Sequence, residues 1–412
     1  MGTLENGMRF FINRDPNLSD TCITYVVNYG SINERYVEGA HLLEHVVAQG
    51  GTDTKTAEDI LTEIRYFKDF NAETTYDDYT AFYVLAGKRE IGRAIEFLSN
   101  IVNCSMIPEP SVEREKRRVV CEVLERMDEI PCRVENIVFR AMFGSEAFGS
   151  FEERLDSVKR ITAAHLRSEY NSFFVPENTI MVVNTGLKHT EILDIINNHA
   201  HIEGDERRLS RTMHRKGMLY LENHTENDIL VEAEGINSSR IGIGIPLPGA
   251  LRFNRPHDYV AIELLGKAIS ERIYERGLLS GLYIYSNDVS ALIGRDSSSI
   301  IVQTSTNPNT EDIRDVKRFI VDQIRTVSDG VMSKREMDYY KRSLRREIKE
   351  LGCDVYSNAN YAVMASGNGK DHIDMVSDIS IRYLRDFARG IDPDRLASVI
   401  FVPKKSTNIR SE

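Results

Sequence analysis

The sequence lacks several features that would assign it to a specialised class of protein. Its 412 residues contain no apolar run that approaches the roughly 18 residues needed by a membrane-spanning helix. The segment from Met1 to Gly7 has neither the basic start nor the apolar stretch of a secretory signal peptide. We therefore expect no membrane span and no signal peptide.

Paired cysteines and excess basic charge are also missing. The cysteines are odd in number, five, and none of them forms a C-x-x-C pair, which argues against a disulfide framework. This usage is typical of a reducing compartment, so we expect a cytoplasmic protein. The net charge of −11 is unlike the basic surface that binds nucleic acid, and we expect no nucleic-acid partner.

The composition that remains is that of a soluble globular protein, with 41% hydrophobic and 28% charged residues. A chain of 412 residues is too long for one ordinary hydrophobic core, which favours two domains. The stretch 199–208 is polar and has no periodicity. We therefore predict a first domain over 1–200, a linker over 201–216 and a second domain over 217–412.

Local patterns place several elements in the first half. A helical stretch over 38–49 stops at Gly50-Gly51, and a strand-like stretch covers 79–85. A long, highly charged helix is predicted over 111–129, with Ser111 as its N-cap. These assignments put the chemically interesting residues on helices.

One helix carries the pattern H-x-x-E-H, formed by His41, Glu44 and His45. At about 100° per residue, positions i, i+3 and i+4 share one face, so both imidazoles can reach one metal ion. The surrounding residues are largely apolar, and polar groups in such a setting need partners. The alternative is two solvated histidines on an exposed helix, and the apolar neighbours argue against it.

Zinc at such a site needs a third protein ligand and an open position for water. Glu122 is a candidate on the long charged helix, and Glu115 lies two turns earlier on the same face. Most charges of this helix are those of a solvated face. Glu122, however, sits among valines, Val119, Val120 and Val123. From the residues alone, Glu122 remains one of two readings, a ligand or an exposed charge.

Two segments of the second half line up with the first half at a shift of 222 residues, and the first of them places Leu42-Leu43 on Leu264-Leu265. The shift places Ser111 on Ser333, which also opens a long charged helix. It replaces every residue of the candidate site by a different one: His41 by Glu263, Glu44 by Gly266, His45 by Lys267, Glu115 by Met337 and Glu122 by Leu344. An internal duplication with one chemical site per chain is therefore predicted.

These motifs resemble those of the inverted-zincin peptidases, such as pitrilysin, insulin-degrading enzyme and mitochondrial processing peptidase. In that family the third ligand is a glutamate at nearly the 77-residue step that separates His45 from Glu122. An accessory glutamate stands seven residues earlier, as Glu115 does. The resemblance implies Zn²⁺ held by His41, His45 and Glu122. It also implies an α+β fold of two homologous domains, each an antiparallel sheet with helices packed on it.

The resemblance extends to residues that would contact substrate. Asn71 and Ala72 match a family segment on an edge strand, where a peptide adds as a further strand. The family's Arg-x₃-Gly-Leu-x-Tyr is matched imperfectly, because Arg276 is one residue too far from Gly281. The substrate-contacting tyrosine is therefore either Tyr283 or Tyr285, and the place of Arg276 is in doubt.

The expected function is that of a zinc-dependent endopeptidase acting on peptides or unfolded segments, with Glu44 as the base that takes a proton from water. Glu115 would support a ligand, and Arg276 with Tyr283 or Tyr285 would stabilise the oxyanion. Two alternatives are a non-catalytic or partner-dependent subunit of a heteromeric processing peptidase, and a zinc-stabilised binding module. We expect a homodimer or a heterodimer with a related subunit.

Overall fold

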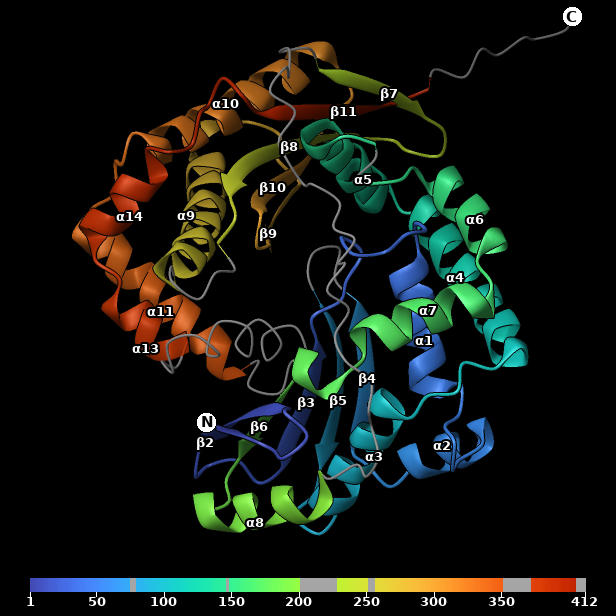
Figure 1. The fold of residues 1–412 in the computed structure, drawn as a ribbon. Coiled ribbons are helices and arrows are strands. Elements are labelled where there is room, and N and C mark those ends of the chain that lie inside the picture. The colour runs from blue at the N-terminus through green and yellow to red at the C-terminus, as the bar shows by residue number, and fades with distance from the viewer. Residues whose placement is uncertain (75–78, 146–147, 201–227, 251–255, 351–371, 405–412) are drawn as a thin grey trace, which may run out of the picture.

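The computed structural model describes residues 1–74, 79–145, 148–200, 228–250, 256–350 and 372–404 (Figure 1). The predicted linker, 201–216, lies outside the described residues. Two β-sheets form the framework, one from each half of the chain. In Figure 1 the blue-to-green first half and the yellow-to-red second half occupy different parts of the molecule.

The first sheet has the strand order β1-β2-β6-β3-β5-β4. Only β2 and β6 run parallel, and the other neighbours are antiparallel. Its strands are β1 (Gly2–Thr3), β2 (Arg9–Arg14), β3 (Thr21–Val27), β4 (Asp69–Thr74), β5 (Thr80–Ala86) and β6 (Thr179–Thr185). The helices of this half are α1 (Gly39–Gln49), α2 (Ala57–Ile64), α3 (Ile91–Asn103), α4 (Glu109–Asp128), α5 (Ile130–Phe143), α6 (Phe151–Arg160), α7 (Ala163–Phe173) and α8 (His189–His199), with a 3₁₀ turn at Pro176–Asn178.

The second sheet repeats this topology, with the order β7-β11-β8-β10-β9. The pair β7 and β11, which corresponds to β2 and β6, is again parallel, and the remaining pairs are antiparallel. Its strands are β7 (Ile229–Ala233), β8 (Ser239–Pro248), β9 (Ser286–Ile293), β10 (Ser297–Thr306) and β11 (Ala397–Pro403). Its described helices are α9 (Pro256–Ser280), α10 (Thr310–Ser328), α11 (Lys334–Glu350), α13 (His372–Asp378) and α14 (Ile381–Ala388). The α+β fold class with two related halves is confirmed, and one parallel pair in each sheet refines the expected antiparallel arrangement.

Strand β3 explains how the first sheet is buried on both faces. All of its residues are buried, and their side chains alternate between two hydrophobic clusters. Ile23, Tyr25 and Val27 pack with the first-half helices. Cys22 and Val26 belong to a cluster that continues into the second half. The two halves therefore share apolar surface as well as a repeated topology.

Helix α5 crosses from the first half onto the second sheet, as Figure 1 shows. The approach is possible because Gly242 and Gly244 occupy alternate positions of β8, on the face toward the helix. A Cβ atom on Gly244 would lie 2.6 Å from Val138 of α5. The isoleucines between and beside these glycines face the opposite way, into the second-half core. The glycine positions thus fix where the first half docks on the second.

Replacing Gly242 with alanine is expected to destabilise the protein by about 1–3 kcal/mol, because the new methyl group would overlap the stiff side chain of Val134. Chemical denaturation followed by circular dichroism measures this loss. The matched control is Gly266→Ala in α9, where a Cβ meets no atom of the described residues within 4 Å. That change should instead stabilise the helix by about 0.5–1 kcal/mol. Equal stability of the two variants would contradict the packing argument.

The long charged helices differ in how they begin. Ser333 caps α11, because its Oγ accepts the amide of Glu336 at 3.1 Å. The prediction that Ser111 caps α4 is wrong, since α4 begins at Glu109 after Pro108. Ser111 instead lies inside the helix and donates to the carbonyl of Gly50 at 2.9 Å. Among the residues that the structure describes, no helix is long and apolar enough to cross a membrane.

Candidate metal centre

Helix α1 carries the H-x-x-E-H residues with its apolar face in the core. Ala40, Leu42, Leu43, Val46 and Val47 are buried in the first-half cluster. At the N-terminus, a carboxylate oxygen of Glu34 accepts the amide of Ala40 at 3.0 Å. A negative charge there satisfies an amide that has no partner within the helix, and it complements the helix dipole.

Helix α4 lies antiparallel to α1 and is joined to its C-terminal end. Arg114 Nη2 donates to the carbonyl of Gln49 at 3.1 Å, and Arg118 donates to the Gln49 side chain. The Ser111 hydroxyl binds the next carbonyl along, that of Gly50. Carbonyls at a helix end lack internal partners and attract basic side chains. These contacts fix the register that brings the later turns of α4 beside His41 and His45.

This register brings His41, His45 and Glu122 together, and each offers a ligand atom within 4.8 Å of the others. Nε2 of His41 lies 3.2 Å from Nε2 of His45 and 3.1 Å from Oε2 of Glu122. Nε2 of His45 lies 3.5 Å from the other carboxylate oxygen of Glu122. Among the described residues, this is the group of histidine, cysteine and acidic side chains that could hold a metal ion.

The separations suit tetrahedral zinc. Ligand atoms about 2.0–2.2 Å from a tetrahedral Zn²⁺ lie about 3.3–3.5 Å from one another. The two separations that share Nε2 of His41, 3.1 and 3.2 Å, are close to that edge length. The third, 3.5 Å, joins Nε2 of His45 to the other oxygen of the Glu122 carboxylate. Two imidazoles and one carboxylate are also a donor set that zinc accepts, with one position left for water. The residues present therefore fit the ion that the motif implies.

The electrostatics of the site favour a positive charge between the carboxylates. Burial by itself lowers the pKa of His41, but hydrogen bonds with Glu122 and Glu38 and the charge of Glu44 raise it to about 10. The hydrogen bond with His41 likewise lowers the pKa of Glu122. In the metal-free protein a proton on His41 supplies that positive charge, and a bound cation would replace it.

Glu115 lies beside Nδ1 of His45, on the side away from the other candidate ligands, in the supporting position that the resemblance implies. It is fully buried, and its Oε2 lies 3.6 Å from Nδ1 of His45. Burial raises the pKa of Glu115, but the contact with His45 and the charges of Arg114 and Arg118 lower it below its ordinary value. Arg114 Nε and Arg118 Nη1 lie 2.8 and 3.1 Å from its two oxygens. Glu115 is thus an ionised carboxylate directed at the ring nitrogen of His45 that faces away from the metal position.

A second outer carboxylate, Glu38, was missed by the sequence reasoning. Its Oε2 lies 2.7 Å from Nδ1 of His41, and its Oε1 accepts a hydrogen bond from the buried Arg154 of α6. Burial raises the pKa of Glu38, but His41 and Arg154 outweigh it and lower the pKa to about 2. The available signal was the position three residues before His41, one helical turn away. No local sequence pattern indicated the hydrogen bond between Arg154 and Glu38.

Glu44 lies one turn after His41 and one residue before His45 on α1, with 7% of its surface exposed. Its charge is among the causes that raise the pKa of His41, so the carboxylate is close to the ligand set. A carboxylate in this place can take a proton from a water molecule at the open position. The role of base assigned to Glu44 remains a prediction.

Asn71 and Ala72 lie on β4, which is an edge strand of the first sheet. They pair with Tyr83 and Phe82 of β5 on one side. The amide of Ala72 donates to Oδ1 of Asn71 at 2.9 Å. β4 also packs against α1, so this edge of the described sheet runs beside the helix that carries the two histidines. An extended peptide could pair with this edge, and the substrate contact itself stays a prediction.

Arg276, Tyr283 and Tyr285 lie in or just after the last turns of α9, and all three are exposed. Arg276 lies close enough to Glu336 of α11 for their charges to interact. The hydroxyl of Tyr285 donates to Asn307 at 2.9 Å. Within the described part of the chain, no hydrogen bond or ion pair joins these residues to the candidate ligands. Both tyrosines line one groove, so the choice between them stays open.

In the second half, ion pairs occupy the place of the metal ligands. Glu263, the counterpart of His41, binds Nε2 of His372 at 2.7 Å, and Lys267, the counterpart of His45, pairs with Glu347. The counterparts of the α4 glutamates, Met337 and Leu344, are buried in the core. Histidine and lysine side chains therefore contact the acidic groups there, and the described residues of this half offer no ligand set at the duplicated position.

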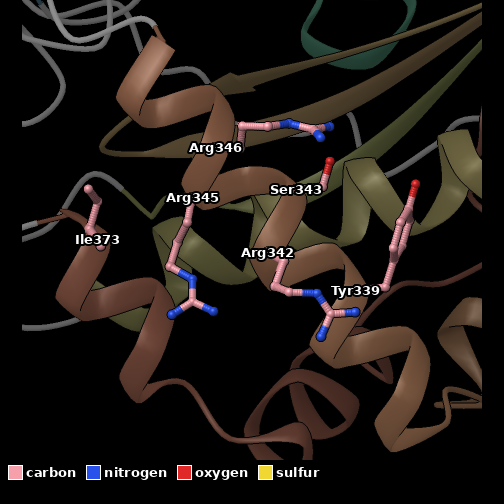
Figure 2. A pocket seen from close by; sticks show the side chains of 6 residues that line it. All are labelled: Tyr339, Arg342, Ser343, Arg345, Arg346 and Ile373. Carbon is pink, nitrogen blue, oxygen red and sulfur yellow. The ribbon is translucent and has the colours of Figure 1, made fainter.

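A different hollow in the second half has the opposite chemistry (Figure 2). It is lined by Tyr339, Arg342, Ser343, Arg345 and Arg346 of α11, together with Ile373 of α13. Guanidinium groups donate hydrogen bonds and attract carboxylates or phosphates, whereas a metal ion needs acceptor atoms. This hollow is therefore unsuited to a cation, in contrast to the site between α1 and α4.

Two family models match the chain in succession. Residues 9–151 match the model described as insulinase, peptidase family M16. Residues 160–344 match the model described as the inactive domain of peptidase M16. The first match contains every candidate ligand, and the second contains their substituted counterparts.

Individual relatives agree with these matches. The chain is 25% identical over 203 residues to subunit beta of the mitochondrial-processing peptidase of Homo sapiens. The aligned region covers 48% of this chain and 40% of that protein. It is 24% identical over 194 residues to an uncharacterized zinc protease of Streptomyces coelicolor, covering 46% of this chain and 42% of that protein. The matched region is thus less than half of either relative's length.

The fold has a close counterpart among solved structures. The crystal structure of a putative M16-like peptidase from Alicyclobacillus acidocaldarius superposes with a TM-score of 0.78 at 17% sequence identity. The superposition covers 98% of this chain and 97% of that one. At this identity the likeness establishes the fold, including both halves.

Proposed function

Because this chain belongs to the M16 family of peptidases, we propose that it is a zinc-dependent endopeptidase that hydrolyses peptides or unfolded polypeptide segments. The observation that carries the proposal is the set of ligand-atom separations, 3.1 to 3.5 Å, among His41, His45 and Glu122. A relative named as a zinc protease supports the identity of the metal. The retained Glu44 supports catalysis over a purely structural role for zinc.

Different side chains of the site would carry out different parts of the reaction. His41, His45 and Glu122 would hold zinc, which when bound lowers the pKa of water toward about 7 and polarises the scissile carbonyl. Glu44 accepts a proton from the attacking water on its carboxylate and passes it to the leaving amine. Glu115, whose carboxylate lies 3.6 Å from Nδ1 of His45, would orient that ring through its negative charge. Arg276, with Tyr283 or Tyr285, is proposed to stabilise the oxyanion.

The substrate is proposed to bind in extended form along β4. The free edge of this strand offers backbone groups to a further strand, and it runs beside α1. Main-chain pairing fixes the direction of a peptide without reading much of its sequence, which suits segments that are already unfolded. Asn71 and Ala72 are the proposed contact residues on this strand.

A non-catalytic or partner-dependent subunit is the second candidate. It is supported by the matched relative, which is named as a subunit, and by the inactive-domain match over residues 160–344. The intact H-x-x-E-H set and its ligand-like separations favour a catalytic chain. In either case we propose a homodimer or a heterodimer with a related subunit. Light scattering that shows a monomer at micromolar concentration would contradict both assemblies.

We also propose a cytoplasmic location. The support is the cysteine usage, since no disulfide joins the described cysteines, which are Cys22, Cys104, Cys121 and Cys132. Fractionation of cells that produce the protein tests this location.

Cleavage of a mixed peptide library, followed by mass spectrometry of the products, tests the function. The zinc-loaded protein should generate products that a chelator suppresses and added zinc restores. Protein that binds zinc but yields no product, alone or with a related subunit present, would contradict the peptidase proposal. A product pattern that survives chelation would contradict the role of zinc.

A further inference from the structure

Glu38 connects the candidate metal centre to a helix that supplies no ligand. One carboxylate oxygen lies 2.7 Å from Nδ1 of His41, and the other accepts a hydrogen bond from Nε of Arg154. Arg154 stands in the first turn of α6, 116 residues further along the chain. Both side chains are buried, with 5% and 4% of their surfaces exposed. The buried carboxylate of Glu38 thus bridges the imidazole of His41 and the buried guanidinium of Arg154.

The backbone conformation of Glu38 also indicates that its side chain serves His41. Its φ of 70° and ψ of 5° are left-handed, a conformation that strains a residue with a Cβ atom. Ile107 is the other non-glycine residue with positive φ in the described part of the chain. The side chain of Glu38 makes no capping hydrogen bond to α1, and Glu34 binds the Ala40 amide instead. The strained conformation therefore directs the carboxylate to His41 rather than to the helix end.

We propose that Glu38 is a positioning residue of the zinc centre, which holds His41 with Nε2 directed toward Glu122 and His45. An acceptor at Nδ1 places the hydrogen of the neutral ring there, so the lone pair is on Nε2, the atom that faces the other ligands. Arg154 fixes the carboxylate in turn. Glu38 does for His41 what Glu115 does for His45. The inference rests on the proposed function because it requires zinc at this centre.

Zinc affinity of the metal-free, full-length protein tests the role directly. Competition with a chromogenic chelator gives the dissociation constant of zinc for the wild type and for Glu38→Gln and Glu38→Gly. We expect both changes to raise this constant about 10–100-fold, the usual effect of losing such a partner. Glycine accepts a left-handed backbone without strain, so Glu38→Gly stays informative where glutamine disturbs folding. Circular dichroism of each metal-free variant verifies the fold.

Glu34→Gln is the matched control, because Glu34 is also a buried carboxylate at the start of α1. It should keep the zinc dissociation constant of the wild type. A rise equal to that of Glu38→Gln would overturn the proposal, because it would show a general effect of charge at this helix end. Wild-type affinity in both Glu38 variants would also overturn it and leave the proposed function intact. A wild-type protein that binds no zinc would overturn both.

Arg154 gives an independent test of the chain of contacts. Arg154→Met should weaken zinc binding in the wild-type background, because the Glu38 carboxylate loses the group that fixes it. In the Glu38→Gly background the same change should have no further effect on the zinc dissociation constant. An equal loss of zinc affinity in both backgrounds would show that Arg154 affects the metal centre independently of Glu38. That result would overturn the proposal that Arg154 acts by fixing the Glu38 carboxylate.

Discussion

Replacing Glu44 with glutamine is expected to abolish peptide cleavage while zinc stays bound. Glutamine has the size of glutamate, so it fits the same largely buried position, which is 7% exposed. Its amide cannot accept a proton from water, and a positioned base of this kind contributes about 10²–10⁴-fold to a rate. We therefore expect kcat/KM for a cleaved library peptide to fall by at least that factor. Elemental analysis should still find the wild-type amount of zinc.

The matched control for this change is Glu58→Gln on α2, where the glutamate is exposed in the first turn of the helix. It should keep both activity and zinc. An active Glu44→Gln protein would remove Glu44 as the base and leave the metal ligands unaffected. A Glu44→Gln protein that loses its zinc would instead indicate that this carboxylate helps to retain the ion.

Replacing Glu122 with glutamine is expected to reduce zinc binding more than any change in the outer carboxylates. Loss of an outer partner typically costs about 10–100-fold in metal affinity, and a direct ligand should cost more. Glu122 supplies both a ligand oxygen and the negative charge that lies 3.1 Å from Nε2 of His41. Glutamine keeps a carbonyl oxygen but not the charge. Activity at limiting zinc should fall together with the zinc content.

Thermal unfolding gives a second measurement of the Glu122 change. A ligand that binds only the folded state stabilises it by about 2.7 kcal/mol at a concentration of 100 times its Kd. Added zinc should therefore raise the Tm of the wild type and raise that of Glu122→Gln much less. Glu125→Gln, one turn later on the exposed side of α4, is the control and should respond as the wild type does. Unchanged zinc content in Glu122→Gln would remove it from the ligand set.

The parts of the site that were predictable follow local rules. His41, Glu44 and His45 share a helix face because helix geometry depends only on neighbouring residues. The Asn71–Ala72 segment lies on an edge strand, as the family resemblance implied. Glu122 was different, because its own surroundings left two interpretations open, a metal ligand and an exposed charge. Only the family's spacing favoured the interpretation of Glu122 as a ligand. The structure then places the Glu122 carboxylate beside His41 and His45.

The internal duplication is much clearer in the strand order of the two sheets than in the sequence. Two short segments at one offset suggested a repeat, while most positions differed. The structure repeats five strands in the same order and direction, β2-β6-β3-β5-β4 and β7-β11-β8-β10-β9. Strand order survives substitution because it depends on the pattern of buried positions rather than on particular residues. The ligand positions did not survive, and Glu263 and Lys267 now form ion pairs there.

The sequence by itself determined which residues are candidates for the chemistry: those of one H-x-x-E-H helix and one long charged helix, with a second half in which the candidate ligands are replaced. Tertiary structure decided what surrounds that chemistry. The antiparallel register of α4 on α1, set by Ser111, Arg114 and Arg118, brings Glu122 and Glu115 to their histidines. The contact of Arg154 with Glu38, and the docking of α5 on Gly242 and Gly244, join segments more than 100 residues apart. Such contacts depend on how whole elements pack, so no local pattern of residues encodes them.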